Sequence, residues 1–287
     1  MGHLTDGNRS RNRGQGKLGR SLDILKRNHV TVLGSGERTL VFGHGFGCDQ
    51  KMWRLVAPRF ADRYRVVLFD YVGSGLSQLD QYDPAKYGSL AGYSRDLLDV
   101  MEALELRDAV FVGHSVSSMI GAMASIRHPE YFERLVMVGP SPRYLNDPPG
   151  YYGGFDRDDI DELLEMMQLN FSGWASYMAP AAMQNGDRRE LSDELERQFA
   201  SRDPRIARQF AEVTFYSDCR DILGEVQTPT LILQCAEDSI APLEVGDYLH
   251  KHLNGSTLNR MTAKGHYPQL SQPDETFERI DHYLAGL

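Results

Sequence analysis

Cysteine is scarce in this chain, with three residues among 287. Cys48, Cys219 and Cys235 lie far apart in the sequence, so we expect neither a disulfide framework nor a CxxC metal or redox site. An HExxH motif and close clusters of cysteine and histidine are also missing, and the sequence therefore predicts no metal ion and no cofactor. Unpaired cysteines are typical of a reducing compartment, which favours a cytoplasmic protein.

Long apolar runs and an excess of positive charge are also lacking. No run approaches the roughly 20 residues that a membrane span needs, and the first twenty-odd residues contain no signal-peptide apolar core. The net charge of −9 argues against non-specific binding to nucleic acid or to an anionic membrane. We therefore expect a small uncharged or weakly charged partner, no nucleic acid and no membrane.

Apolar side chains are few in residues 1–22, which are rich in Gly, Asn and Arg. A segment of this composition cannot bury enough apolar area to fold by itself. The sequence predicts a disordered basic tail here rather than a functional basic arm.

The rest of the chain is organised around residues 109–121, which combine an apolar strand, a sharp turn and the start of a small-residue helix. A serine on such a turn, here Ser115, presents its hydroxyl above the end of a parallel sheet, as in the nucleophile elbow of α/β-hydrolases. Gly113 stands two residues before the serine as the elbow pattern requires, but Ser117 replaces the second glycine. Residues 113–117 alone fit an ordinary serine-rich helix start equally well. Ser117 also puts normal catalytic turnover in question.

Strand-like apolar runs alternate with helical patterns along most of the chain, which predicts an α/β-hydrolase fold with a mostly parallel sheet and helices on both faces. The predicted strands lie at residues 29–33, 39–43, 65–70, 109–112, 134–139, 230–236 and 256–261. Between residues 147 and 218 the pattern changes to four amphipathic helical stripes. We therefore predict a core formed by residues 23–142 and 219–287 and a four-helix lid at residues 143–218.

Three residue types of a catalytic triad occur in the chain order serine, acid, histidine that α/β-hydrolases use. Ser115, Asp238 and His266 each follow closely after a predicted strand. A serine hydroxyl becomes a nucleophile when an imidazole takes its proton and a carboxylate fixes that imidazole. Glu237 is the competing acid. A serine instead of an aspartate at position 115 disfavours epoxide or haloalkane hydrolysis.

A small-residue turn at residues 44–47 follows the second predicted strand, and a helical pattern follows it over residues 52–56. This is where α/β-hydrolases place the second donor of the oxyanion hole, so we expect the backbone N–H groups of Phe46 and Val116 to form it. His44 is interpreted as a turn residue packed beneath the site. A lid must also present an apolar face to the pocket that it covers, which makes Phe155, Trp174 and Phe215 pocket candidates.

Five further runs of sequence resemble the bacterial RsbQ stress regulators and the related plant karrikin and strigolactone receptors. These runs are residues 46–50 (FGCDQ), 69–75 (FDYVGSG), 112–116 (VGHSV), 137–147 (MVGPSPRYLND) and 152–155 (YGGF). The run Leu233 to Ala236 before Asp238 favours the bacterial branch. Gln269 stands where relatives often carry a second histidine, which we expect to change only the polarity of the pocket.

The resemblance implies an active triad over a closed apolar pocket lined by Phe46, Tyr144, Phe155, Trp174 and Phe215. It also implies a signalling role, in which the bacterial members act with a PAS-domain phosphatase to activate the general stress sigma factor. Our first hypothesis is a serine hydrolase that cleaves an ester or lactone of a small apolar compound. The alternative is a ligand sensor that recruits a partner, with slow or dispensable hydrolysis.

Overall fold

A central seven-stranded sheet dominates the computed structural model, which describes residues 19–286. The strand order is β1-β3-β2-β4-β5-β6-β7, and every neighbouring pair is parallel except β1 with β3. This confirms the predicted mostly parallel sheet. The strands are β1 (Thr31–Leu33), β2 (Thr39–Gly43), β3 (Arg65–Leu68), β4 (Ala109–His114), β5 (Phe132–Val138), β6 (Thr230–Gln234) and β7 (Ser256–Arg260).

Strands β2, β4 and β6 are buried along their whole length. Parallel strands with helices on both faces read as continuous apolar runs, which is why these strands were recognisable in the sequence. Because parallel strands end at the same edge of a sheet, residues that follow β2, β4, β5 and β6 meet there.

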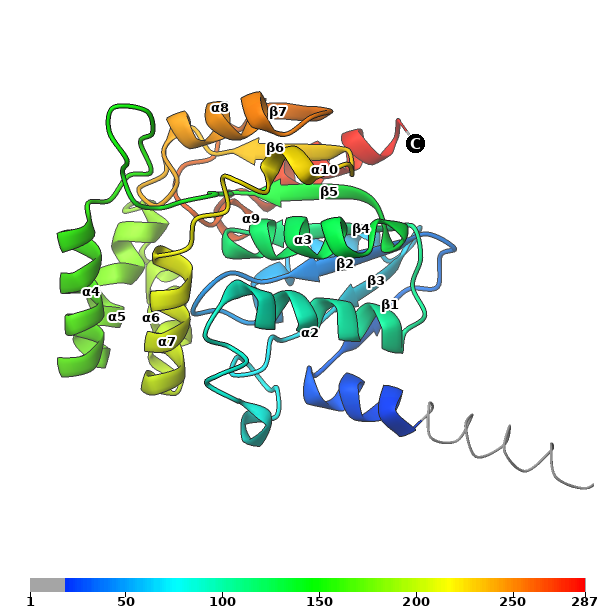
Figure 1. Ribbon diagram of the computed structural model, residues 1–287, viewed down its shortest axis with the longest axis horizontal. Helices are drawn as coiled ribbons and strands as arrows, with labels where there is room; N and C mark the ends of the chain where they lie inside the picture. Colours follow the sequence, from blue (N-terminus) through cyan, green and yellow to red (C-terminus); the bar gives the residue numbers. More distant parts are fainter. Residues whose placement is uncertain (1–18, 287) are drawn as a thin grey trace, which may run out of the picture.

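Helices cover both faces of the sheet (Figure 1). Helices α2 and α3 pack together on one face, and the rings of Phe60 and Phe277, 4.7 Å apart, join η2 to α10 on the other. The core helices are α2 (Leu90–Ala103), α3 (Val116–Arg127), α8 (Leu243–His252), α9 (Pro268–Ser271) and α10 (Pro273–Leu284). The 3₁₀ helices are η1 (Gln50–Trp53), η2 (Ala57–Phe60), η3 (Leu79–Gln81), η4 (Pro129–Tyr131) and η5 (Leu223–Glu225).

Four helices within residues 157–215 gather at the end of the sheet toward which β5 and β6 point (Figure 1). They are α4 (Arg157–Leu169), α5 (Phe171–Met183), α6 (Arg189–Ala200) and α7 (Pro204–Phe215). A capping box formed by Asp156 and Asp159 begins α4, and the Asp203 carboxylate accepts hydrogen bonds from the first N–H groups of α7. No helix among residues 19–286 is long and apolar enough to cross a bilayer.

Two local expectations differ from the structure. Residues 19–27 are helical, so the last four residues of the predicted tail belong to a helix, while residues 1–18 lie outside the described part. The Arg27 guanidinium anchors this helix, since it lies 2.9 Å from the Asp99 carboxylate on α2. The helix predicted over residues 52–56 is replaced by the 3₁₀ helices η1 and η2 and the turn between them, because the N–H groups of Arg54 and Val56 bond to carbonyls three rather than four residues earlier.

Candidate active site

Ser115 occupies a strained turn between β4 and α3. Its backbone has φ +54° and ψ −122°, and its N–H donates to the Val138 carbonyl at 2.8 Å. A side chain at position 113 would bring its Cβ to 2.8 Å from the Ser117 backbone, so glycine is required there. The turn holds the Ser115 side chain at the carboxyl edge of the sheet, where it is 5% exposed.

The structure brings Ser115, His266 and Asp238 together. The Ser115 Oγ lies 2.8 Å from His266 Nε2, and His266 Nδ1 lies 2.8 Å from Asp238 Oδ2. The side chains of His266 and Asp238 are 3% and 0% exposed. With the Nδ1 proton on the imidazole, Nε2 is free to accept the hydroxyl proton of the serine.

Asp238, rather than Glu237, faces the imidazole. The second Asp238 oxygen accepts from the backbone N–H groups of Ile240 and Ala241, at 2.8 and 3.0 Å, which fixes the carboxylate in the turn. Glu237 points to the surface, where its carboxylate pairs with the Lys264 ammonium at 2.6 Å. Glu237, the competing acid, therefore makes no hydrogen bond with His266.

The turn at residues 44–47 lies against Ser115. A Cβ placed on Gly45 would come within 3.4 Å of the Ser115 Cβ and 2.5 Å of the His114 ring, so this turn can approach only as glycine. The N–H groups of Phe46 and Val116 have no hydrogen-bond partner among the described residues. Buried unpaired donors beside a nucleophile are what an oxyanion hole requires.

Ser117 fits at the elbow without displacing it. Its hydroxyl donates to the His44 carbonyl at 2.5 Å and lies 2.8 Å from the Tyr71 hydroxyl. The His44 Nε2 accepts from the Tyr71 N–H at 3.1 Å, and burial lowers the pKa of this imidazole. His44 is thus a neutral residue that holds the turn beneath the site.

A cavity of about 20 Å³ lies over Ser115, which is room for about one water molecule. Of the five predicted pocket residues, Phe46, Tyr144 and Phe215 line it. The Tyr144 hydroxyl lies 3.2 Å from the Ser115 Oγ, and burial raises the pKa of this phenol. The remaining lining side chains, which were not predicted, are Met178, Ala182, Phe199, Thr214, Ile240 and Tyr267.

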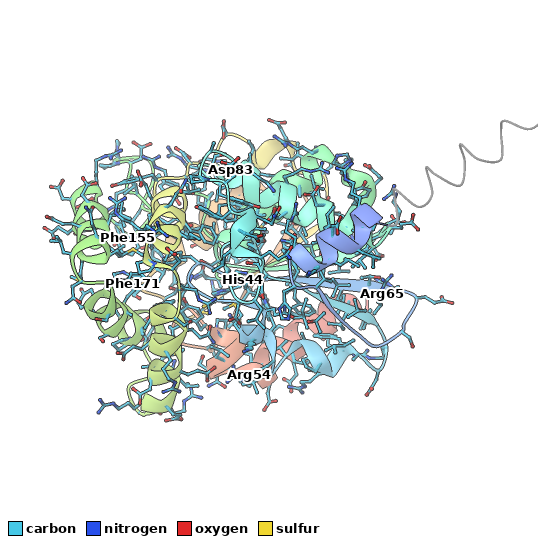
Figure 2. The ribbon with its side chains drawn as sticks, turned by 90° about the horizontal axis from the view of Figure 1, so that it is seen from below. His44, Arg54, Arg65, Asp83, Phe155 and Phe171 are labelled. Atoms are coloured by element: carbon cyan, nitrogen blue, oxygen red, sulfur yellow. The ribbon has the colours of Figure 1, made fainter. Side chains whose placement is uncertain are left out.

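Phe155 and Trp174 line a separate groove of about 400 Å³ between α4, α5 and the loop after β6, which corrects their expected place. The Phe215 and Phe46 rings stand between them and the cavity, at 5.8 Å from Phe155 and 5.9 Å from Trp174. In Figure 2, Phe155 lies among the helices of residues 157–215, with His44 nearer the centre of the molecule. Met178 and Ile240 line both hollows and separate them.

A larger surface groove of about 590 Å³ runs between the start of α2 and α7. It contains none of the predicted site residues, so volume alone does not locate the site.

Gln269 is fully buried, and neither polar atom of its amide has a partner among the described residues. It does not line the cavity over Ser115. Gln269 therefore has no direct contact with the cavity through which it could change the polarity of the pocket as expected.

The fold and the site define the class of this protein, and the chain belongs to the alpha/beta hydrolase fold family, whose model matches residues 38–273. Among curated proteins, it is 42% identical over 253 residues to the karrikin insensitive 2 receptor CA of Petunia hybrida, covering 88% of this chain and 93% of that protein. It is 40% identical over 252 residues to the strigolactone esterase D14 of Arabidopsis thaliana, with 88% and 94% covered.

A solved structure of a hydrolase from Oleispira antarctica is 40% identical, with a TM-score of 0.91 over 93% of this chain and 98% of that chain. The predicted fold class is confirmed, and so is the resemblance to the plant receptor hydrolases. The closer affinity to the bacterial stress regulators stays a prediction.

Proposed function

We propose that this chain is a serine hydrolase that cleaves an ester or lactone of a small apolar compound. The observation that carries the proposal is the continuous chain of hydrogen bonds from the Ser115 Oγ through His266 to Asp238, with 2.8 Å at each step. The esterase named among the relatives supports the same reaction class.

In the proposed reaction the Ser115 oxygen attacks the carbonyl carbon while His266 Nε2 takes the hydroxyl proton. The N–H groups of Phe46 and Val116 stabilise the negative oxygen that forms. His266 then gives its proton to the leaving alcohol, and an acyl group remains on Ser115. A water molecule, activated by the same imidazole, releases the acid and restores the serine.

The helices at residues 157–215 serve as the proposed lid, with residues 143–218 as its full extent and residues 23–142 and 219–287 as the core. Mostly apolar side chains line the cavity over Ser115, which favours a substrate with little charge. The free and buried thiols of Cys48, Cys219 and Cys235 favour a reducing compartment, and we place the protein in the cytoplasm.

Purified protein with short-chain nitrophenyl esters and lactones tests the proposal. We expect hydrolysis by the wild type and a loss of about 10³-fold or more in kcat for Ser115→Ala. A fluorophosphonate probe should label Ser115 in the wild type. Equal activity of the two proteins, or an unlabelled Ser115 in folded wild type, contradicts the proposal.

A ligand sensor is the second candidate function, and the small volume of the cavity over Ser115, about 20 Å³, favours it, because a ligand that enters must displace the surrounding helices and a partner can recognise that displacement. A relative named as a receptor supports the same idea. The bacterial resemblance proposes a PAS-domain phosphatase as its partner. If the protein is a sensor, Ser115→Ala should lose ester cleavage but still bind both the ligand and the PAS-domain phosphatase. Calorimetry measures both binding reactions.

A further inference from the structure

Helix α5 ends directly against the two loops that carry Asp238 and His266. The last four carbonyl groups of an α-helix have no partner within the helix and must find one elsewhere. In α5 the Pro180 carbonyl accepts from the Gln184 N–H, where Gln184 has φ +55° and ends the helix. The carbonyls of Ala181, Ala182 and Met183 remain to be satisfied.

The Ala181 carbonyl accepts a hydrogen bond from the loop that carries Asp238. Ser239, which follows Asp238, donates its hydroxyl to Ala181 at 2.8 Å. The Ser239 N–H donates to the side-chain oxygen of Gln184 at 3.0 Å. Two hydrogen bonds donated to the end of α5 therefore hold Ser239, the residue next to the carboxylate that faces His266.

The Ala182 carbonyl accepts a hydrogen bond from the loop that carries His266. It accepts from the backbone N–H of His266 at 2.8 Å. Gly265 has φ +84°, and a Cβ there would lie 2.0 Å from the Met183 carbonyl, so the contact needs glycine beside the histidine. The Gly265 N–H also donates to the Glu237 carbonyl at 2.7 Å, which ties the two loops to each other.

These contacts, which we call the α5 anchor, join Ala181, Ala182, Met183 and Gln184 to Ser239, Gly265 and His266. Helix α5 also supplies Met178 and Ala182 to the wall of the cavity. Because that cavity holds about one water molecule, a substrate reaches Ser115 only when the wall moves. Movement of α5 stretches the α5 anchor, so the loops of Asp238 and His266 lose their hydrogen bonds to this helix at the same time.

We propose that the end of α5 positions the triad, with Ser239 as the positioning residue for Asp238, so that the pairing of Asp238 with His266 is completed only when α5 closes over the cavity. The inference rests on the proposed hydrolase function and adds the order in which its steps occur. Substrate enters while α5 is displaced, and proton transfer follows after α5 returns.

The test compares Ser239→Ala with Ser239→Thr, which keeps the hydroxyl, using nitrophenyl acetate. Ser201→Ala is the matched control, because the Ser201 hydroxyl donates to the Gln198 carbonyl in the same group of helices and touches neither loop. We expect kcat of Ser239→Ala to fall about fivefold with KM within about twofold, as expected for one positioning hydrogen bond. Ser239→Thr restores kcat, and Ser201→Ala leaves it unchanged.

A second measurement separates positioning from general destabilisation. The proton between His266 Nδ1 and Asp238 gives a far-downfield NMR resonance when the pair is fixed. We expect this resonance in the wild type and in Ser239→Thr, and a broadened or missing one in Ser239→Ala at a temperature where circular dichroism shows the native fold. Gln184→Ala, which removes the acceptor of the Ser239 N–H, should act in the same direction.

Wild-type kcat and an unchanged resonance in both Ser239→Ala and Gln184→Ala overturn the inference. So does an equal loss of kcat in Ser201→Ala, because the effect would then follow from the helices in general. Failure of the proposed function has a different signature, since Ser115 of the wild type would not react with fluorophosphonate.

Discussion

Ser117 connects two loops of the site through a hydroxyl that the glycine of the elbow pattern lacks. It donates to the carbonyl of His44, the first residue of the turn that approaches Ser115, and contacts the Tyr71 hydroxyl. The absence of a side chain at Gly43 makes room for it, because a Cβ there would lie 3.0 Å from the Ser117 Oγ. The serine therefore ties the start of α3 to the predicted oxyanion turn.

Replacing Ser117 by glycine restores the usual elbow pattern but removes both contacts. We expect Ser117→Gly to lower the free energy of unfolding by about 1–2 kcal/mol, from the lost hydrogen bonds and the poorer helix former. We also expect a lower kcat on nitrophenyl acetate, because residues 44–47 lose their tether. Denaturant unfolding and steady-state kinetics measure the two effects.

Ser125→Gly is the matched control for this change. Ser125 lies in the same helix, is buried, and donates only to the Ala122 carbonyl within α3. It should lose stability with unchanged kcat. A higher kcat in Ser117→Gly would show that the serine impairs turnover, as the elbow pattern alone predicts.

Among the helices and strands, the elements that carry the proposed triad could be predicted because their signals are local. Strand β2 lies where its apolar run predicts, at residues 39–43, and the run before Ser115 coincides with most of β4. The chain order of Ser115, Asp238 and His266 then assigned each side chain to the edge where parallel strands end. Glu237 competes as the acid, but the sequence favours Asp238, because its shorter side chain opens the turn before Ile240 and Pro242.

The wall of the cavity could not be predicted, because it depends on how α4 to α7 pack on one another. A helical stripe identifies the residues that face inward, but not the hollow that they reach. Met178 and Trp174 belong to the same stripe of α5, yet Met178 lines the cavity and Trp174 lines only the outer groove. The hydrogen bond between the Tyr144 and Ser115 hydroxyls joins residues 29 positions apart and leaves no local signal in the sequence.

Met178 separates the cavity over Ser115 from the 400 Å³ groove, which leads to a prediction about substrate size. Truncation to alanine should join the two hollows. We expect Met178→Ala to raise kcat/KM for nitrophenyl hexanoate relative to acetate by about tenfold, as several methylene groups gain space. The free energy of unfolding should fall by about 2–3 kcal/mol.

Met166→Ala provides the control, because Met166 lines only the outer groove and is 38% exposed. Its chain-length preference should equal that of the wild type. An unchanged preference in Met178→Ala would mean that another side chain forms the partition.

At the scale of the whole molecule, two buried imidazoles make stability depend on pH. His114 donates from Nε2 to the His266 carbonyl at 2.7 Å, and its Nδ1 has no partner among the described residues. Burial lowers the pKa of His114 well below its ordinary value of 6.5, and burial lowers that of His44 as well. Both imidazoles are therefore neutral in the folded protein at neutral pH.

The unfolded chain binds protons on these histidines below about pH 6.5, whereas the folded protein does not. Stability from this source is complete above that pH and is lost progressively as the pH falls below it toward the lowered pKa values of the folded protein. We expect His114→Gln, which keeps a donor for the His266 carbonyl, to reduce the loss of stability between pH 7 and pH 5 by up to about 2 kcal/mol. Urea unfolding at the two pH values measures the difference.

The exposed His282 supplies the comparison, since His282→Gln should leave the pH dependence as it is in the wild type. If His114→Gln and the wild type lose equal stability on acidification, His114 is not the residue that resists protonation in the folded protein.

The α5 anchor constrains how the helices over the site can be exchanged between relatives. A chimaera that takes residues 157–215 from another hydrolase brings new residues at positions 181–184, while Ser239 and Gly265 stay with the host chain. Such a graft can fold and even close its pocket, yet leave the side chains of Asp238 and His266 misaligned. Donor segments should therefore be transplanted together with residues 239 and 265, as one unit drawn from three separate stretches of sequence.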